Sequence, residues 1–320
     1  MPSSTRQALL QALSAAEGEY ISGQQLAETL GVSRAAVHKA AAALTAQGYA
    51  LEAAPRRGYR LTGGDPFCAE AAGEYPAPAY VYDTLESSNR TAKLLALDGA
   101  PHGTLVLTAH QSAGRGRLGR RFESPAGKGV YCSVLLRPEV PAASAQTVTI
   151  SAAVAVCRAV KALCGIELSI KWVNDLYYQG KKVCGILTEA GTDLESGRLD
   201  WLVVGIGLNL TSTAADWPEE LAAKAGSLYP GGPAPVSRAA LAGAIARELL
   251  ALCPGFDCLE EYRARCFVPG HWVTVCAVTE TYAAKALAID DEGRLVVRRE
   301  NGREEALCCG EVTTRPAKTD

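Results

Sequence analysis

The stretch Gly114-Arg-Gly-Arg-Leu-Gly-Arg-Arg121 decides how this 320-residue sequence is interpreted, because it places three glycines and four arginines in eight residues. Glycine lets the backbone approach a ligand closely, and arginine presents a permanently charged, planar fork of donors that suits phosphate or carboxylate. A solvated basic turn is the plain alternative, but glycines at this density are costly to order unless something holds the loop. The stretch therefore predicts a loop that closes on a small anion.

The same residues fit the dinucleotide fingerprint G-x-G-x-x-G, which needs a strand before the glycines and a helix directly after them. Residues 104–108 are β-branched and apolar and can form that strand. Residues 123–129 hold a proline and two glycines, and residues 130–136 then read as a further strand. The missing helix disfavours a Rossmann fold.

The overall composition is that of a globular protein, with 48% hydrophobic and 21% charged residues. A net charge of -2 gives no global attraction to nucleic acid or membrane, so any such binding is expected to be local. The apolar runs are far shorter than the ~20 residues of a membrane span, and the N-terminus does not read as a signal peptide. Eleven cysteines without a C-x-x-C pair predict free thiols, no metal held by a protein cluster, and a cytoplasmic location.

Residues 1–65 predict a winged helix-turn-helix domain. Ser22 and Ser33 are expected to cap two short helices separated by Gly31, and residues 51–61 read as two strands around a basic turn. Such a domain places one helix in the DNA major groove and its wing on the backbone, although a winged helix can also serve protein contacts. The candidate DNA-binding residues are Ser33, Arg34, His38, Lys39, Arg56 and Arg57.

Residues 66–268 predict a mixed α/β domain, and the fold class of the whole chain is α+β. Strands are expected at 81–82, 104–108, 130–136, 168–178, 182–188 and 199–210, and helices at 90–97, 146–163, 237–253 and 258–265. The strands at 168–178 and 182–188 read as a hairpin with its turn at Gln179-Gly180. Residues 269–320 predict a small β-barrel with short strands at 271–278, 283–289, 295–299 and 304–307.

Three clusters of polar residues are expected to converge on one site. They are the arginine loop with Gln111, the stretch Lys171-Trp-Val-Asn-Asp175 followed by Lys181 and Lys182, and Gly205-x-Gly-x-Asn209. Cations, glycine backbone and amides together suit the stabilisation of a phosphoryl group during transfer. Asp175 is expected to help hold Mg²⁺ or to orient a lysine, with a turn-capping acid as the plain alternative.

These clusters resemble the motifs of a known family. Gln111-x-x-Gly-Arg-Gly-Arg-x-Gly-Arg120, Lys171-Trp-x-Asn-Asp175, Lys182-x-x-Gly-Ile-Leu187 and Gly205-x-Gly-x-Asn209 are similar to the motifs of biotin–protein ligases. The three-part layout resembles the bifunctional kind, which is both ligase and biotin-operon repressor. Class II synthetase-like ligase domains and an SH3-like C-terminal barrel are what this resemblance implies for the fold. Three mild departures are Val173 for the usual proline, Glu86-Ser-Ser-Asn89 for D-S-T-N, and Phe122 for tryptophan.

The resemblance implies a two-step reaction with a defined set of residues. Biotin and Mg²⁺-ATP form biotinyl-5′-adenylate, and a lysine of a biotin carboxyl carrier protein then takes the biotin. The implied catalytic residues are Lys182, Arg117 and Asp175. Those implied for biotin are Ser87, Ser88, Asn89, Gln111, Gly114, Arg115, Arg117, Lys182 and Gly205. Those implied for ATP and the adenylate are Arg115, Arg117, Arg120, Lys171, Asn174, Asn209 and Trp217.

The implied partners are the carrier protein, operator DNA and, with adenylate bound, a second copy of the chain; no membrane is expected. Two alternatives stay open at this point. One is a lipoate–protein ligase, which shares the chemistry, although the spelling of the arginine loop favours biotin. The other is a transcription factor whose second domain senses a ligand without catalysis, against which the intact Lys182, arginines and Asp175 argue.

Overall fold

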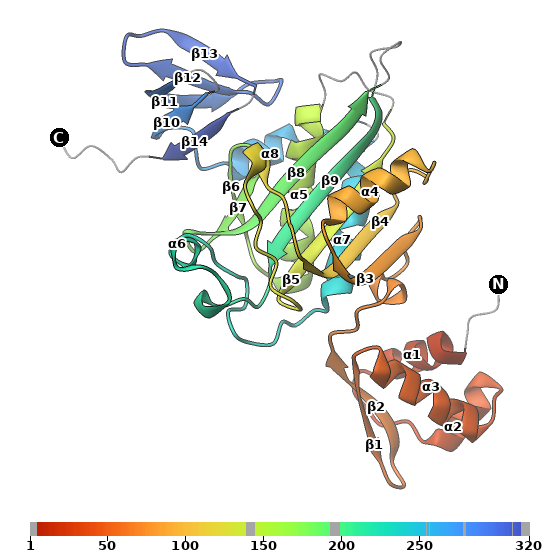
Figure 1. Ribbon diagram of the computed structural model, residues 1–320. Coiled ribbons are helices and arrows are strands. Elements are labelled where there is room, and N and C mark those ends of the chain that lie inside the picture. Colours follow the sequence, from red (N-terminus) through yellow and green to blue (C-terminus); the bar gives the residue numbers. More distant parts are fainter. Residues whose placement is uncertain are drawn as a thin grey trace. The chain divides into compact units, whose positions relative to one another are not determined.

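The computed structural model describes residues 5–138, 145–192, 199–253, 255, 257–277, 280–308 and 310–314, and the chain divides into two compact units (Figure 1). The first unit holds the described residues up to Ala71 together with 236–239, and the second holds 72–235 and the residues from 240 onward. The predicted α+β class is confirmed. The predicted boundaries at 65/66 and 268/269 stay predictions, and the second and third predicted domains lie within one compact unit.

The first unit is the predicted winged helix-turn-helix. Its elements are α1 (Thr5–Ala15), α2 (Gly23–Leu30), α3 (Arg34–Ala46), β1 (Tyr49–Ala54) and β2 (Gly58–Gly64). The capping predictions are confirmed, because the Ser22 hydroxyl accepts the N–H of Gln25 and the Ser33 hydroxyl that of Ala36, each at 3.1 Å. Gly31 ends α2 with a left-handed φ of 64°. Leucines of all three helices form the buried core.

The second unit is built on a seven-stranded sheet in the order β3-β4-β5-β9-β8-β7-β6. The strands are β3 (Ala79–Leu85), β4 (Leu105–Gln111), β5 (Gly129–Leu136), β6 (Ser169–Lys171), β7 (Asp175–Tyr178), β8 (Lys181–Thr192) and β9 (Leu199–Asn209). The pair β3–β4 is parallel and every other pair is antiparallel. All residues of β5 are buried, so this strand lies in the middle of the core.

Helices cover both faces of this sheet (Figure 1). They are α4 (Ser88–Leu97), α5 (Ala145–Cys164), α7 (Arg238–Leu252) and α8 (Leu259–Arg265), whereas α6 (Glu219–Ala222) is a short helix in the segment that follows β9. Helix α4 contacts β4, β5 and β9 on one face, and α5 contacts β8 and β9 on the other. By length and composition alone α5 could cross a membrane, but most of it is buried in the fold, as for the core helix of a soluble protein.

The C-terminal part is a five-stranded antiparallel sheet in the order β13-β12-β11-β10-β14. Its strands are β10 (Trp272–Cys276), β11 (Thr281–Ile289), β12 (Leu295–Arg299), β13 (Glu304–Leu307) and β14 (Glu311–Thr314). The predicted C-terminal β domain is confirmed. The expected strand at 271–278 is shorter than predicted among the described residues, and β14 was absent from the predicted strands although it pairs with β10.

The predicted single strand at 168–178 is wrong. The chain turns at residues 172–174 and returns, so that β6 pairs with β7 before β7 pairs with β8. The Asn174 carbonyl accepts the N–H of Ile186 at 2.9 Å, and the Asn174 amide donates to the Ile186 carbonyl at 2.8 Å. These bonds to β8 hold the turn, and the Trp172–Val173 peptide within it is cis. The predicted hairpin turn at Gln179-Gly180 is present, with positive φ at both residues.

Candidate active site

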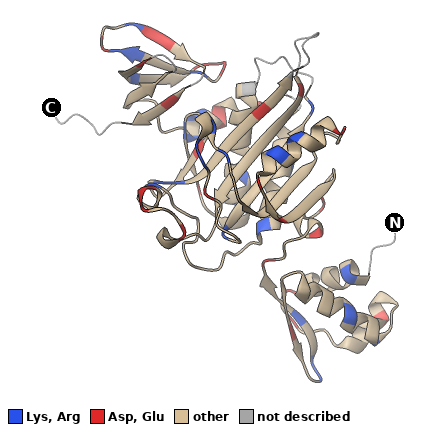
Figure 2. Cartoon of the chain, viewed as in Figure 1, with Lys and Arg blue, Asp and Glu red and all other residues tan. Residues whose placement is uncertain are grey.

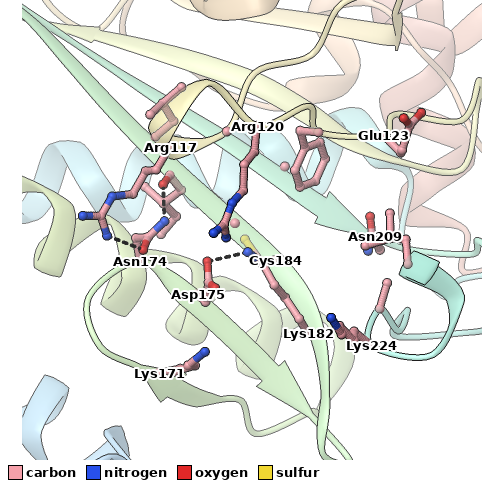
Figure 3. A pocket seen from close by; sticks show the side chains of 18 of the residues that line it. Arg117, Arg120, Glu123, Lys171, Asn174, Asp175, Lys182, Cys184, Asn209 and Lys224 are labelled. Carbon is pink, nitrogen blue, oxygen red and sulfur yellow. Dashed lines mark hydrogen bonds and ion pairs between the residues drawn. The ribbon is translucent and has the colours of Figure 1, made fainter. Parts of the chain in front are cut away.

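A cavity of about 850 Å³ opens in the second unit where β4, β7, β8 and β9 meet the arginine loop (Figure 3). All three clusters singled out in the sequence line it, together with β14 and the segment that follows β9. A cavity of this size lies within the range of sites that bind a cofactor-sized molecule. Distant parts of the chain therefore converge on one site, as the sequence predicts.

Lys182 and Asp175 form an ion pair in this cavity. The Lys182 ammonium lies 2.6 Å from Asp175 Oδ1, and the side chains of Lys182 and Asp175 are 36% and 20% exposed. The backbone of Lys182 is also fixed, because its N–H donates to the Lys224 carbonyl at 3.1 Å and its carbonyl accepts the N–H of Gly226 at 2.8 Å. A lysine held in this way offers a positioned positive charge to an anionic ligand.

The arginine loop is a small hairpin that is docked on its surroundings. The Phe122 N–H donates to the Gly114 carbonyl at 2.9 Å, which closes the base of the loop. Arg117 reaches Asn174 Oδ1 and the Gly310 carbonyl, each at 3.0 Å. Arg120 makes a two-pronged contact with Glu311 at 2.7 and 2.5 Å. The hydrogen bonds from Arg120 hold the pKa of the Glu311 carboxyl below its ordinary value, so the loop is tied to β14 by charge.

A buried hydrogen-bonded group lines one end of the cavity. Gln111 Oε1 accepts the backbone N–H of Ser88 at 2.9 Å and its hydroxyl at 3.2 Å, and the Gln111 amide donates to Ser124 at 2.9 Å. Ser133 lies behind them and donates to Ser88 Oγ at 2.8 Å or to Asn89 Oδ1 at 2.6 Å. Hydroxyls and amides with fixed partners suit recognition of a small polar ring rather than of a charge.

The glycines of β9 make room for protein side chains. A Cβ at Gly205 would lie 2.1 Å from Asn89 Oδ1, and one at Gly207 would lie 2.4 Å from the Phe122 ring. Gly114 belongs to the same class, since its Cβ would lie 2.4 Å from the Phe122 carbonyl. The sequence analysis assigned these glycines to the close approach of a ligand, whereas the space they leave is occupied by the side chain of Asn89 and by Phe122.

Comparison with known proteins identifies the family. Residues 81–209 match the biotin/lipoate A/B protein ligase family, and residues 5–60 match a helix-turn-helix domain. The bifunctional ligase/repressor BirA of Bacillus subtilis (strain 168) is 36% identical over 94% of this chain and 96% of its own length. This chain belongs to the bifunctional biotin ligase/repressor family. The predicted ligase class and the predicted N-terminal DNA-binding type of domain are thereby confirmed.

Two further relatives of the family agree with this assignment. The bifunctional ligase/repressor BirA of Escherichia coli (strain K12) is 32% identical over 61% of each chain. Among solved structures, biotin protein ligase from Aquifex aeolicus in complex with biotin and ATP aligns with a TM-score of 0.60. It is 25% identical and covers 74% of this chain and 98% of its own.

The cavity brings together nearly all the ligand and catalytic residues that the family resemblance implies. Those lining it are Ser87, Ser88, Asn89, Gln111, Arg115, Arg117, Arg120, Lys171, Asn174, Asp175, Lys182, Gly205, Asn209 and Trp217. The exception is Gly114, which does not line the cavity but packs at the base of the loop beside Gln111. What each residue binds stays a prediction.

Sequence reasoning missed several residues of the site. Lys224 brings a further cation to the cavity wall, and Glu311 anchors the arginine loop. Phe122 was noted only as a departure from the family pattern, yet its ring fills the space above Gly207 and meets Tyr131 edge-on at 6.3 Å. The sequence shows that Lys224 is basic. Its position beside Lys182 depends on a backbone hydrogen bond between residues that are 42 positions apart in the chain.

Lys171 is a half-buried cation in the cavity. Burial lowers the pKa of its ammonium below the ordinary value, and this effect outweighs the attraction of Asp175. Its Nζ lies 6.0 Å from the centre of the Tyr177 ring. A charge removed from water in this way is stabilised by the arrival of a ligand phosphate, which fits its predicted place at ATP.

In the first unit, the candidate DNA-binding side chains are exposed, and basic residues stand at the tip of the wing (Figure 2). Arg34, His38 and Lys39 lie on exposed positions of α3, and Arg56 and Arg57 lie in the wing turn. The Ser33 hydroxyl accepts the N–H of Ala36 as a helix cap and keeps its own O–H as a donor, so its contact with DNA stays a prediction. Arg57 stacks over the ring of Tyr20 at 4.0 Å, a contact that the sequence did not suggest.

Proposed function

We propose that this chain joins biotin to ATP as biotinyl-5′-adenylate and then passes the biotin to a lysine of a biotin carboxyl carrier protein. The observation that carries the proposal is the single cavity in which the Ser88–Gln111 group lies at one end and the Lys182–Asp175 pair at the other. Biotin has a polar ureido ring and a carboxylate, so one end of the cavity suits its ring and the other its charge.

The cavity residues account for the first step by electrostatics and positioning. A carboxylate oxygen of biotin attacks the α-phosphorus of ATP, the bond to the bridging oxygen breaks, and pyrophosphate leaves. Lys182 offsets the negative charge that gathers on the carboxylate and the α-phosphate as they approach. Arg115, Arg117 and Arg120 lie above them on the loop and would keep water from the mixed anhydride.

Asn209 is suited to the nucleotide end of the site. Its amide donates to the Gly226 carbonyl at 3.0 Å, which leaves the buried Oδ1 with no hydrogen-bond partner among the described residues. An unpaired buried acceptor is unfavourable, and the amino group of adenine would satisfy it. Trp217 lines the same cavity and offers a flat apolar surface for the base.

In the second step the carrier lysine attacks the carbonyl carbon of the adenylate, AMP leaves, and the amine loses a proton. Asp175 is the carboxylate placed to take that proton or to guide the amine. Mg²⁺ would enter with ATP as part of that substrate. The cavity carboxylates Glu123, Asp175 and Glu311 are each paired with a basic side chain, so the described residues offer no ready-made magnesium site.

The winged helix adds a second role, repression of biotin genes from operator DNA by a dimer that forms when adenylate is bound. The exposed basic residues of α3 and the wing support the DNA contact. We place this activity in the cytoplasm, away from any membrane. Removing residues 1–65 should abolish the shift of an operator fragment while leaving adenylate synthesis intact, and a retained sequence-specific shift would overturn the assignment.

The ligase proposal is tested by measuring pyrophosphate release with ATP and either biotin or lipoate, with calorimetry of each acid in the presence of ATP. Biotin-dependent release that requires Lys182 supports it. Release that depends on lipoate instead would favour a lipoate ligase. Biotin binding without any release would favour a ligand-sensing regulator.

A further inference from the structure

A half-buried chain of polar contacts leads from α4 to the Ser88–Gln111 end of the cavity. Lys93 on α4 lies 2.7 Å from Glu189 Oε1 on β8. Glu189 Oε2 accepts a hydrogen bond from the Asn89 amide at 2.8 Å, and the same amide nitrogen donates to the Leu187 carbonyl at 3.2 Å. Glu189 does not line the cavity, whereas Asn89 does.

These contacts determine which atoms Asn89 can offer to a ligand. A side-chain amide has two N–H groups, and both are taken by Glu189 and Leu187. Its Oδ1 lies 2.6 Å from the Ser133 hydroxyl, which donates either to it or to Ser88, so Oδ1 has at least one lone pair left. Asn89 can therefore act toward the cavity only as an acceptor.

Glu189 prevents the amide from turning over. An ionised carboxylate only accepts hydrogen bonds, so a flipped Asn89 would set its oxygen against that of Glu189. Burial raises the pKa of the Glu189 carboxyl, but hydrogen bonds from Lys93 and Asn89 outweigh burial and bring the pKa below its ordinary value. The carboxyl thus stays ionised at neutral pH. Gly205 contributes by leaving space for Oδ1, since a Cβ there would lie 2.1 Å from it.

We propose that Glu189 is a positioning residue that holds Asn89 Oδ1 as an acceptor for an N–H of the ligand ring, so that the site selects ligands with such an N–H. The ureido ring of biotin carries two of them, and in this respect the inference rests on the proposed function. A ring with a methylated nitrogen, or a ligand without N–H groups such as lipoate, would leave the second lone pair of Oδ1 without a partner. Unpaired buried acceptors are the strongest source of discrimination between similar ligands.

The test compares biotin with its two mono-N-methylated analogues in the full-length wild-type chain and in Glu189→Gln. Biotin-dependent pyrophosphate release gives KM and kcat for each acid and for ATP. We expect Glu189→Gln to raise the KM for biotin about tenfold, the factor that one hydrogen bond of ~1.4 kcal/mol supplies, with the KM for ATP unchanged. For one of the two analogues, the penalty relative to biotin should shrink by a similar factor.

Two further variants separate positioning from a merely structural tie between α4 and β8. Lys93→Met removes the ion pair but keeps the acceptor oxygens, so its KM for biotin should rise by less than threefold. Asn89→Ala keeps the Lys93–Glu189 pair and should abolish the discrimination against the same analogue, which provides a test even if Glu189→Gln does not fold.

An unchanged ratio of the KM for biotin to the KM for the analogue, in Glu189→Gln or in Asn89→Ala, would overturn the inference. An increase of the KM for biotin in Lys93→Met equal to that in Glu189→Gln would also overturn it. Failure of the proposed function itself would look different, because the wild-type chain would then release no pyrophosphate with biotin.

Discussion

Gly207→Ala tests whether the glycines of β9 serve the aromatic ring above them. In the middle of a strand, replacing glycine by alanine ordinarily stabilises the fold by ~0.5–1 kcal/mol, because glycine loses more backbone freedom. At Gly207 the added Cβ would lie 2.4 Å from the nearest atom of the Phe122 ring, whereas ordinary contact begins at 3.4 Å. The ring must therefore move.

Phe122 has little freedom to move. Its backbone N–H is bonded to Gly114 at the base of the arginine loop, and its ring packs edge-on against the buried Tyr131. Overpacking of this kind costs about 1–3 kcal/mol. If the displaced ring disturbs the arginine loop, that range corresponds to a loss of roughly 5- to 150-fold in adenylate affinity.

The assay is steady-state pyrophosphate release at several biotin concentrations, with the dissociation rate of biotinyl-5′-adenylate and thermal unfolding measured in parallel. Gly232→Ala is the matched control, because a Cβ there meets nothing within 4 Å and its backbone φ is not positive. We expect faster adenylate dissociation and a lower Tm in Gly207→Ala alone. Equal Tm and equal dissociation rates in the two variants would refute the account of Phe122 and Gly207.

Three further predictions concern the charged groups of the cavity. Lys182→Met should lower the rate of adenylate formation by about 10²–10³, the usual loss of a positioned electrostatic group, and near-normal pyrophosphate release would remove Lys182 from the first step. Glu311→Gln should speed adenylate dissociation only about two- to fivefold, because Arg120 is largely exposed and such pairs contribute at most ~1 kcal/mol, and an unchanged rate would show that β14 does not anchor the loop. Since burial depresses the pKa of Lys171, this residue loses its charge at a lower pH than an ordinary lysine, so the KM for ATP should rise as the pH is raised through that pKa. Measurements of the KM for ATP between pH 7 and 10 should show this rise in the wild-type chain. If the KM for ATP rises with pH in Lys171→Met as well, Lys171 is not the titrating group.

Local signals in the sequence were sufficient for the first unit. Ser22, Gly31 and Ser33 mark helix ends through bonds to residues three or four positions away, so their structural effect can be predicted without knowing the rest of the fold. The break in the predicted strand at 168–178 depends instead on hydrogen bonds between Asn174 and Ile186 on β8. Hydrophobic periodicity and strand propensity cannot predict a turn that is stabilised by hydrogen bonds to a neighbouring strand.

For the site, too, the sequence was informative where the signal is local and uninformative where a residue is placed by contacts with distant parts of the chain. Motif spacing identified the residues around Lys182 and the arginine loop, because each motif is contiguous in the sequence. Glu311 lies 191 residues from Arg120, and Lys224 is placed at the cavity by a backbone hydrogen bond from Lys182 to its carbonyl. Acidic and basic residues are common on any surface, so the ion pair of Glu311 with Arg120 and the position of Lys224 become apparent only when the fold is known.

The glycines of β9 leave space for protein side chains, and not directly for a ligand, at two different parts of the cavity. Gly205 leaves space for Asn89 at the polar end, and Gly207 leaves space for Phe122 beneath the arginine loop. A side chain at either position would displace a residue of a different motif, so each glycine is matched to a partner about 85 to 116 positions earlier in the chain. It follows that Gly207 and Phe122 should be treated as one unit in any redesign, and a smaller side chain at Phe122 should restore much of the function lost in Gly207→Ala. The conformation of the arginine loop thus depends on β9, through Phe122, and on Glu311, through its ion pair with Arg120.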